Sequence, residues 1–147
     1  MCGIAGLIHR GKSSDVGSEM TAMLQSLKHR GPDSTGFALY GVPTEGQYVL
    51  RFKVAEQEDM KHGFDIHQAV VDRKNAVDER LEKLGVTIVS RDAATEYAHR
   101  YTFNFDGDMR KLADYVEDVE GAEILSIGKG LELIKDLGDA TTVANQY

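Results

Sequence analysis

The sequence predicts an α+β fold, because strand patterns and helix patterns are mixed along its middle part. Gln47–Val54 and His99–Phe105 alternate apolar and polar residues, which is the period of a strand with one buried face. Asp65–Leu84 instead repeats its apolar residues at helical spacing. The apolar stripe of this expected helix consists of Ile66, Ala69, Val70, Val77, Leu81 and Leu84.

Three further segments complete the middle of the chain. Val86–Val89 is rich in β-branched residues and predicts a strand, as does Ala122–Ile127. Asp108–Val119 predicts a second helix, with an N-cap at Asp106 or Asp108. The order of the elements is then β-α-β-β-α-β, which is the split β-α-β pattern of ferredoxin-like modules.

We therefore expect three regions in the chain. An inserted α+β subdomain of the ferredoxin-like βαββαβ type occupies residues 47–127, within a few residues at each boundary. Residues 1–46 precede it. Residues 128–147 return from it with a helix over Leu131–Leu137 that is apolar on one side.

The first region has elements of its own. Residues 2–8 are a short apolar run, typical of a buried strand. Ser18–Lys28 repeats methionine and leucine at helical spacing, with Ser18 as its expected N-cap, and Gly31-Pro32 ends that helix. Phe37–Tyr40 is the next expected strand.

Composition excludes several classes of protein. The chain has 147 residues, of which 41% are hydrophobic and 28% are charged, as in a globular domain with an ordinary core. Its net charge of −7 argues against nucleic acid as a partner, because no basic stripe offsets phosphate repulsion. No apolar run approaches the ~20 residues of a membrane span, and no signal peptide is visible. A single cysteine excludes an internal disulfide framework, so we expect a cytoplasmic protein with a reduced thiol.

The only cysteine is Cys2, in the opening run Met1-Cys2-Gly3-Ile4-Ala5-Gly6. Removal of Met1, which aminopeptidases perform ahead of small side chains, leaves a thiol and a free α-amine on one residue. An α-amine titrates at about pKa 7.7–8.0 and can take the proton of its own side chain. The alternative is that this cysteine merely belongs to a hydrophobic first strand.

A second motif, His29-Arg30-Gly31-Pro32-Asp33-Ser34-Thr35-Gly36, follows one helix length later. Together the two motifs resemble those of the class II glutamine amidotransferases, which are N-terminal-nucleophile (Ntn) hydrolases. A weaker likeness returns at Gly121–Tyr147, where the run Ala122–Gly138 resembles stand-alone amidotransferases related to the glutaminase domain of glutamate synthase. The resemblance implies a four-layer αββα sandwich of two antiparallel sheets, of which this chain is expected to hold the N-terminal part.

The resemblance also implies glutamine as the substrate and glutaminase chemistry. The Cys2 thiolate is expected to attack the side-chain amide carbon, and the α-amine to pass the thiol proton to the departing ammonia. Water then releases glutamate from the thioester, and the ammonia serves a partner synthase. The resemblance implies no metal and no organic cofactor for this part of the chain.

Arg30 is the second site residue that the resemblance implies, as a group that organises the site close to the nucleophile. A cation in that place also favours a thiolate. The alternative for Arg30 is a solvated residue that interacts with the helix dipole. Asp33 is expected to orient the loop, and His29 either assists proton transfer or ends the helix.

The substrate-binding residues that the resemblance implies are expected beyond Tyr147. In the family, later strands carry a carboxylate-binding arginine, an Asn-Gly pair that forms the oxyanion hole, and an aspartate for the substrate amine; no Asn-Gly dipeptide occurs here. Three explanations stay open: a fragment of a full amidotransferase, one subunit of a split enzyme, or a non-catalytic interaction or ligand-binding module centred on residues 47–127. Uncovered sheet edges favour a homo- or hetero-oligomer.

Overall fold

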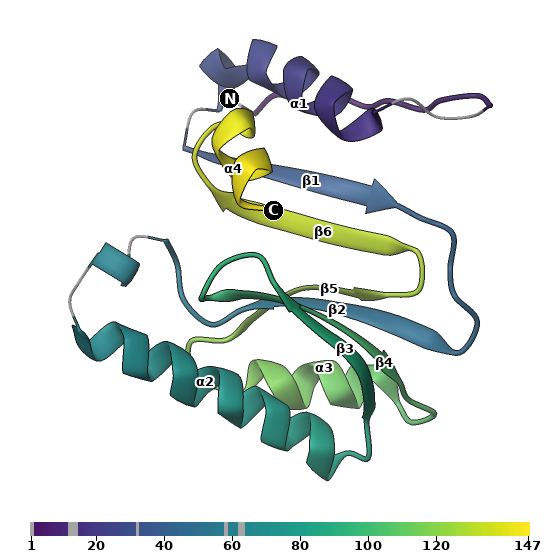
Figure 1. Ribbon diagram of the computed structural model, residues 1–147, viewed down its shortest axis with the longest axis vertical. Coiled ribbons are helices and arrows are strands. Elements are labelled where there is room, and N and C mark those ends of the chain that lie inside the picture. Colours follow the sequence, from purple (N-terminus) through teal and green to yellow (C-terminus); the bar gives the residue numbers. More distant parts are fainter. Residues whose placement is uncertain (1, 12–14, 32, 58, 62–63) are drawn as a thin grey trace. The chain divides into compact units, whose positions relative to one another are not determined.

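Figure 1 shows the fold of the chain, from a computed structural model that describes residues 2–11, 15–31, 33–57, 59–61 and 64–147. Met1 and Pro32, which the sequence predictions invoke, lie outside the described residues. The chain divides into two compact units, residues 1–37 with 135–147 and residues 38–134. The predicted domain limits at residues 47 and 127 stay a prediction.

The described helices and strands confirm the predicted α+β class. In chain order they are α1 (Val16–Ser26), the 3₁₀ turn η1 (Lys28–Arg30), β1 (Ser34–Tyr40), β2 (Gln47–Lys53), the 3₁₀ turn η2 (Asp59–Lys61), α2 (Phe64–Lys83), β3 (Thr87–Ala93), β4 (Ala98–Asn104), α3 (Met109–Glu117), β5 (Glu123–Gly128), β6 (Leu131–Leu137) and α4 (Ala140–Gln146). None of the described helices is both long and apolar enough to cross a membrane.

In the unit of residues 1–37 and 135–147, α1 begins earlier than predicted. Its N-cap is Asp15, whose carboxylate accepts a hydrogen bond from the Ser18 backbone N–H at 3.1 Å. The prediction of Ser18 as the N-cap was therefore wrong. The Asp15 carboxylate also accepts the Ser18 hydroxyl at 2.6 Å, so the serine side chain serves the cap of another residue.

Residues 2–8, predicted as a strand, form neither a strand nor a helix. Ile4 and Ile8 expose 92% and 91% of their surface, whereas Ala5 and Leu7 are half-buried. The alternation of a strand is thus present, but none of the strands described for this chain pairs with the segment. A strand is held by hydrogen bonds to a neighbouring strand, so the apolar pattern of residues 2–8 was not sufficient to predict a strand there.

Leu131–Leu137, predicted as a helix, is instead the strand β6, and it pairs with β1. Its burial alternates, since Ile134 and Asp136 are buried while Lys135 is exposed. Asp139 then caps α4, a helix that the sequence analysis did not predict. The apolar run was short enough to fit either period, and pairing with β1 decided its structure.

Residues 38–134 contain six elements in the predicted β-α-β-β-α-β order, from β2 to β5. The four strands form one antiparallel sheet in the order β3-β4-β2-β5. Leu50 marks the register, because it lies opposite Tyr101 of β4 and Ile127 of β5. Asp108, one of the two predicted positions, caps α3.

The two faces of this four-stranded sheet differ in chemistry. α2 and α3 cover one face (Figure 1), and the core of the unit lies beneath them. This core includes Leu50, Phe52, Val70, Val77, Leu81, Tyr101, Phe103, Leu112 and Val116. Successive side chains of a strand point to opposite sides, so Arg51 of β2 and Arg100 of β4, which pair directly, lie on the face away from the helices.

Candidate functional site

Cys2 is exposed and lines a cavity of about 260 Å³ in the unit of residues 1–37 and 135–147. Arg30 lines the same cavity, as do several residues of the second motif. The full lining consists of Cys2, Gly3, Leu24, Leu27, Lys28, Arg30, Gly31, Asp33, Ser34, Thr35, Gly36 and Ala140. Residues of the two sequence motifs therefore meet at one cavity.

Gly3 allows the N-terminal segment to lie directly against the turn that follows α1. A Cβ atom at Gly3 would be 3.2 Å from Leu27 Cβ and 3.6 Å from Arg30 Cβ. The first of these distances is shorter than an ordinary van der Waals contact, so a larger residue would force either Leu27 or the N-terminal segment to move. The absence of a side chain at Gly3 thus keeps its neighbour Cys2 close to the turn that carries Arg30.

The tight turn η1 holds Arg30 at the cavity. The Leu27 N–H donates to the Leu24 carbonyl and the Arg30 N–H donates to the Leu27 carbonyl, both at 2.9 Å, which is a 3₁₀ pattern. Every residue of η1 is basic. Lys28 and Arg30 both line the cavity, whereas Asp33 is the acidic side chain in its lining. Cations therefore outnumber carboxylates around the cavity, which suits a ligand with an anionic group.

Gly138, in the turn between β6 and α4, holds the start of β1. Its N–H donates to the Asp33 carbonyl at 3.0 Å, and its own carbonyl accepts the Thr35 hydroxyl at 2.9 Å. The φ angle of Gly138 is +110°, a conformation that favours glycine. A Cβ atom there would also lie 3.0 Å from Thr142 Cγ2. The second motif is thus fixed by a turn from the far end of the sequence.

Asp139 is the N-cap of α4, the helix whose residue Ala140 lines the cavity. Its carboxylate accepts hydrogen bonds from the Thr142 N–H at 3.0 Å and the Thr142 hydroxyl at 2.9 Å. Hydrogen bonds from Gln25 first, and then from Thr142, lower the pKa of Asp139 to about 2. The ionised cap fixes the first turn of α4, and Ala140 in that turn lines the cavity.

The structure brings Cys2, Arg30 and Asp33 to one cavity, whereas His29 is exposed and is not part of its lining. The sequence analysis did not single out Lys28 as a lining residue. Its signal was a basic side chain at the helix end that leads into the second motif. The roles predicted for Cys2 and Arg30 stay predictions.

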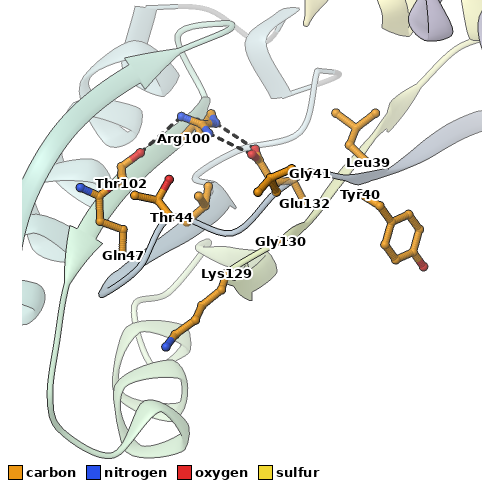
Figure 2. A pocket seen from close by; sticks show the side chains of 12 residues that line it. Leu39, Tyr40, Gly41, Thr44, Gln47, Arg100, Thr102, Lys129, Gly130 and Glu132 are labelled. Atoms are coloured by element: carbon orange, nitrogen blue, oxygen red, sulfur yellow. Dashed lines mark hydrogen bonds and ion pairs between the residues drawn. The ribbon is translucent and has the colours of Figure 1, made fainter. Parts of the chain in front are cut away.

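A second cavity, of about 290 Å³, lies in the unit of residues 38–134, on the sheet face away from the helices. Figure 2 shows Arg100 between Thr102 and Glu132, with hydrogen bonds to both. The rest of the lining consists of Leu39, Tyr40, Gly41, Val42, Thr44, Gln47, Val49, Lys129 and Gly130.

Glu132 lines this second cavity and accepts hydrogen bonds from two arginines, of which Arg100 lines the cavity and Arg51 does not. Arg100 donates to it through Nε and Nη2 at 2.9 Å each, and Arg51 donates through Nε at 2.7 Å. These bonds, from Arg100 first, hold the pKa of Glu132 below its ordinary value, and Glu132 in turn raises the pKa of Arg100. Sequence analysis missed this cluster because it placed Glu132 on a helix.

Over its whole length the chain is similar to a protein named "Putative glutamine amidotransferase" from Methanothermobacter thermautotrophicus, with 31% identity over 152 residues. A shorter match, 38% identical over 60 residues, is to the "Glutamine amidotransferase-like protein GlxB" of Rhizobium meliloti, and it covers 40% of this chain. These matches span 47% of the first relative and 20% of the second. No protein-family model and no solved structure matches the chain. The similarities support a relationship to glutamine amidotransferases.

Proposed function

We propose that Cys2 is the nucleophile of a glutamine amidotransferase of the class II type, and that this chain holds the nucleophile side of the active site. One observation carries the proposal: the exposed Cys2 lines the same cavity as Arg30 of the second motif. The similarity of the whole chain to a protein named as a glutamine amidotransferase agrees with it.

In the proposed reaction, Met1 is removed and Cys2 carries a free α-amine. This amine takes the thiol proton, and the sulfur forms a bond to the side-chain amide carbon of glutamine. When the tetrahedral intermediate collapses, the carbon–nitrogen bond breaks and the proton passes to the nitrogen, which leaves as ammonia. Water then attacks the thioester and the carbon–sulfur bond breaks, which releases glutamate and restores the Cys2 thiol.

Arg30 is proposed to organise this site rather than to form bonds to the substrate carbon. The turn η1 fixes its backbone, and the close approach of Gly3 keeps Cys2 beside that turn. The positive charges of Arg30 and Lys28 in the lining favour the approach of glutamine by its carboxylate.

The finer fold and the partners are also proposals. The β-α-β-β-α-β order and the strand order β3-β4-β2-β5 support an inserted ferredoxin-like subdomain at residues 47–127. We propose that the flanking unit is part of an Ntn-hydrolase αββα sandwich. The remaining substrate contacts are proposed to come from residues beyond Tyr147 or from a second polypeptide. In this proposal the ammonia passes to a partner synthase within a cytoplasmic oligomer.

The test is ammonia release from glutamine by the complete enzyme. Cys2→Ala is expected to abolish it while ammonia-dependent synthesis by the partner survives. A chain with one extra residue before Cys2 keeps the thiol but converts the α-amine into an amide, so it is expected to be inactive too. Ser26→Ala, at an exposed position outside the cavity lining, is the control and should be active. Glutamine hydrolysis by Cys2→Ala would refute the proposal.

The second candidate function is a non-catalytic interaction or ligand-binding module centred on residues 47–127. The cavity beside Arg100 favours this alternative, because it lies within residues 38–134 and requires no nucleophile. The intact mass of the natively expressed chain distinguishes the two functions. A mass without Met1 supports the enzyme, whereas a retained Met1 leaves no α-amine on Cys2 and supports the module.

A further inference from the structure

We propose that the cavity beside Arg100 binds a short aliphatic carboxylate, with the carboxylate group at Arg100 and the carbon chain against Val49. Both residues line the cavity, which lies entirely within residues 38–134. The inference does not depend on whether Cys2 is a nucleophile.

The hydrogen-bonding capacity that remains in this cavity is mainly that of donors. Glu132 already accepts three hydrogen bonds, from Arg51 and Arg100. A fourth bond runs from Arg100 Nη1 to the Thr102 hydroxyl at 3.4 Å. The guanidinium of Arg100, which lines the cavity, has five N–H donors, more than its three hydrogen bonds to Glu132 and Thr102 use. Within the part of the chain that the structure describes, the remaining acidic partner of the arginines is Asp92, 3.6 Å from Arg100. A ligand with acceptor oxygens therefore fits this cavity.

The charges around the cavity also favour an anion. Arg51 and Arg100 pair directly across β2 and β4, and like charges in that position repel each other. Glu132 compensates one of these two charges, whereas Asp92 has a side chain that is 63% exposed and is screened by solvent. A bound carboxylate would compensate the second guanidinium.

Lys129 adds a further cation to the lining. Its ammonium lies 4.8 Å from the centroid of the Tyr48 ring, and in Figure 2 its side chain points away from Arg100. The ammonium therefore lies away from the carboxylate position proposed at Arg100, and it can act on a ligand there only through its long-range charge. Removing its charge leaves the Arg51–Glu132–Arg100 cluster intact, which makes Lys129 a suitable position for a test.

The shape of the cavity distinguishes a carboxylate on a carbon chain from a bare inorganic anion. Leu39, Val42 and Val49 supply apolar surface in the same lining as Arg100. Glu132 occupies the Nε–Nη2 edge of the Arg100 guanidinium, and the Nη1–Nη2 edge can still meet the planar carboxylate of a ligand. The volume of about 290 Å³ is at the small end of ligand cavities, so the carbon chain must be short.

Titration of the full chain with succinate, followed by backbone amide chemical shifts in NMR, tests the proposal. We expect saturable binding, with the largest shifts at the amides of Thr44, Gln47 and Gly130. Succinamide has the same carbon chain without charge and should not bind, and inorganic phosphate should bind more weakly than succinate. No saturable binding, or equal binding of succinamide, would overturn the proposal. Equal binding of phosphate would overturn the assignment to an aliphatic carboxylate.

Variants locate the site. Arg100→Gln is expected to weaken succinate binding by about tenfold or more, because it removes a charge-assisted hydrogen bond. Lys129→Gln should weaken it by about threefold, as expected for an exposed charge. Lys111→Gln removes the same charge from the exposed side of α3, outside the lining, and is the matched control. If Arg100→Gln does not fold, Arg100→Lys decides, because it keeps the positive charge but loses the guanidinium donors: succinate affinity equal to that of the natural chain would refute the site.

Discussion

The side chains of Gln25 and Asp139 are joined by a hydrogen bond of 2.8 Å between Nε2 and Oδ2, although 114 residues separate them in the chain. The carbonyl of the same glutamine amide accepts the Thr141 N–H at 3.2 Å. Both ends of one amide thus bind the first turn of α4. Since α1 leads into η1, and Ala140 lines the cavity at Cys2, this cavity depends on both ends of the sequence.

Replacement of Gln25 tests how much this link stabilises the fold. Gln25→Ala removes the bonds to Asp139 and Thr141, so we expect the Tm of the full chain to fall by a few degrees. The control is Gln68→Ala, which removes a hydrogen bond of 2.9 Å to Asp72 on the exposed side of α2. Circular dichroism melts should show a smaller change for the control. Equal Tm values in the two variants would contradict a structural role for Gln25.

The pH dependence of stability should report on the Asp139 cap. Its pKa falls from 3.8 to about 2 in the folded chain, so the charged form is favoured by folding. Stability from such a depressed pKa is fully present above the unfolded value and is lost as the pH falls through the folded value. Asp139→Asn still caps a helix but cannot ionise.

We therefore expect Asp139→Asn to be less stable than the natural chain at neutral pH. The difference should shrink as the pH falls from 3.8 to about 2. Urea unfolding of both proteins across this range is the measurement. A difference that does not change with pH would mean that the carboxylate charge has no part in the cap.

Removal of the Glu132 charge should destabilise the unit of residues 38–134. Glu132→Gln leaves Arg51 and Arg100 opposite each other without a carboxylate, and we expect a loss of about 2 kcal/mol in the free energy of unfolding. Because the pKa of Glu132 is lowered, chiefly by Arg100, this stability is present at neutral pH and is lost as the solution becomes acidic enough to protonate Glu132. The measurement is urea unfolding at neutral and acidic pH.

The control for Glu132 is an exposed ion pair of the same chemistry. Glu79 lies 3.8 Å from Lys83, and the two side chains are 69% and 65% exposed. Glu79→Gln is expected to cost less than about 0.5 kcal/mol, because solvent screens the pair. Equal losses in Glu132→Gln and Glu79→Gln would show that the arginine cluster contributes nothing beyond a surface pair.

Local periodicity made most of the fold predictable. The helical stripe over Asp65–Leu84 includes Val70, Val77 and Leu81, which are all buried in the structure. The strand β6 was not predicted, because a short apolar run fits both the helical and the strand period. Only its pairing with β1 decides between the two. Residues 2–8 show the converse, a strand pattern without a paired strand among the described residues.

The candidate site was predictable only in part. The motifs at Cys2 and Arg30 are local in sequence, so resemblance could indicate them. The hydrogen bond from Gln25 to Asp139 joins residues that are far apart in the chain, and neither residue type predicts such a partner. The cavity at Arg100 was missed for a related reason: it needs Glu132 on a strand that returns to the sheet face.

The last prediction concerns Gly3, which determines how closely the N-terminal segment approaches η1. In Gly3→Ala the new methyl group would lie 3.2 Å from Leu27 Cβ, so either Leu27 or the segment that carries Cys2 must move by a few tenths of an ångström. A displacement of about 1 Å at a reacting group can cost about 10²-fold in rate, and the smaller shift that this contact requires should cost less than that. We therefore expect the complete enzyme with Gly3→Ala to hydrolyse glutamine more slowly, with the loss in kcat.

Gly6→Ala is the matched control for this substitution, because nothing lies within 4 Å of a Cβ atom at Gly6. Its kcat should equal that of the natural enzyme, and its Tm should be unchanged. Because the Gly3 variant keeps the thiol, alkylation by iodoacetamide should still modify Cys2 in both variants, which separates displacement of the nucleophile from its loss. Equal kcat values for Gly3→Ala and Gly6→Ala would mean that the contact between the N-terminal segment and η1 does not position the nucleophile.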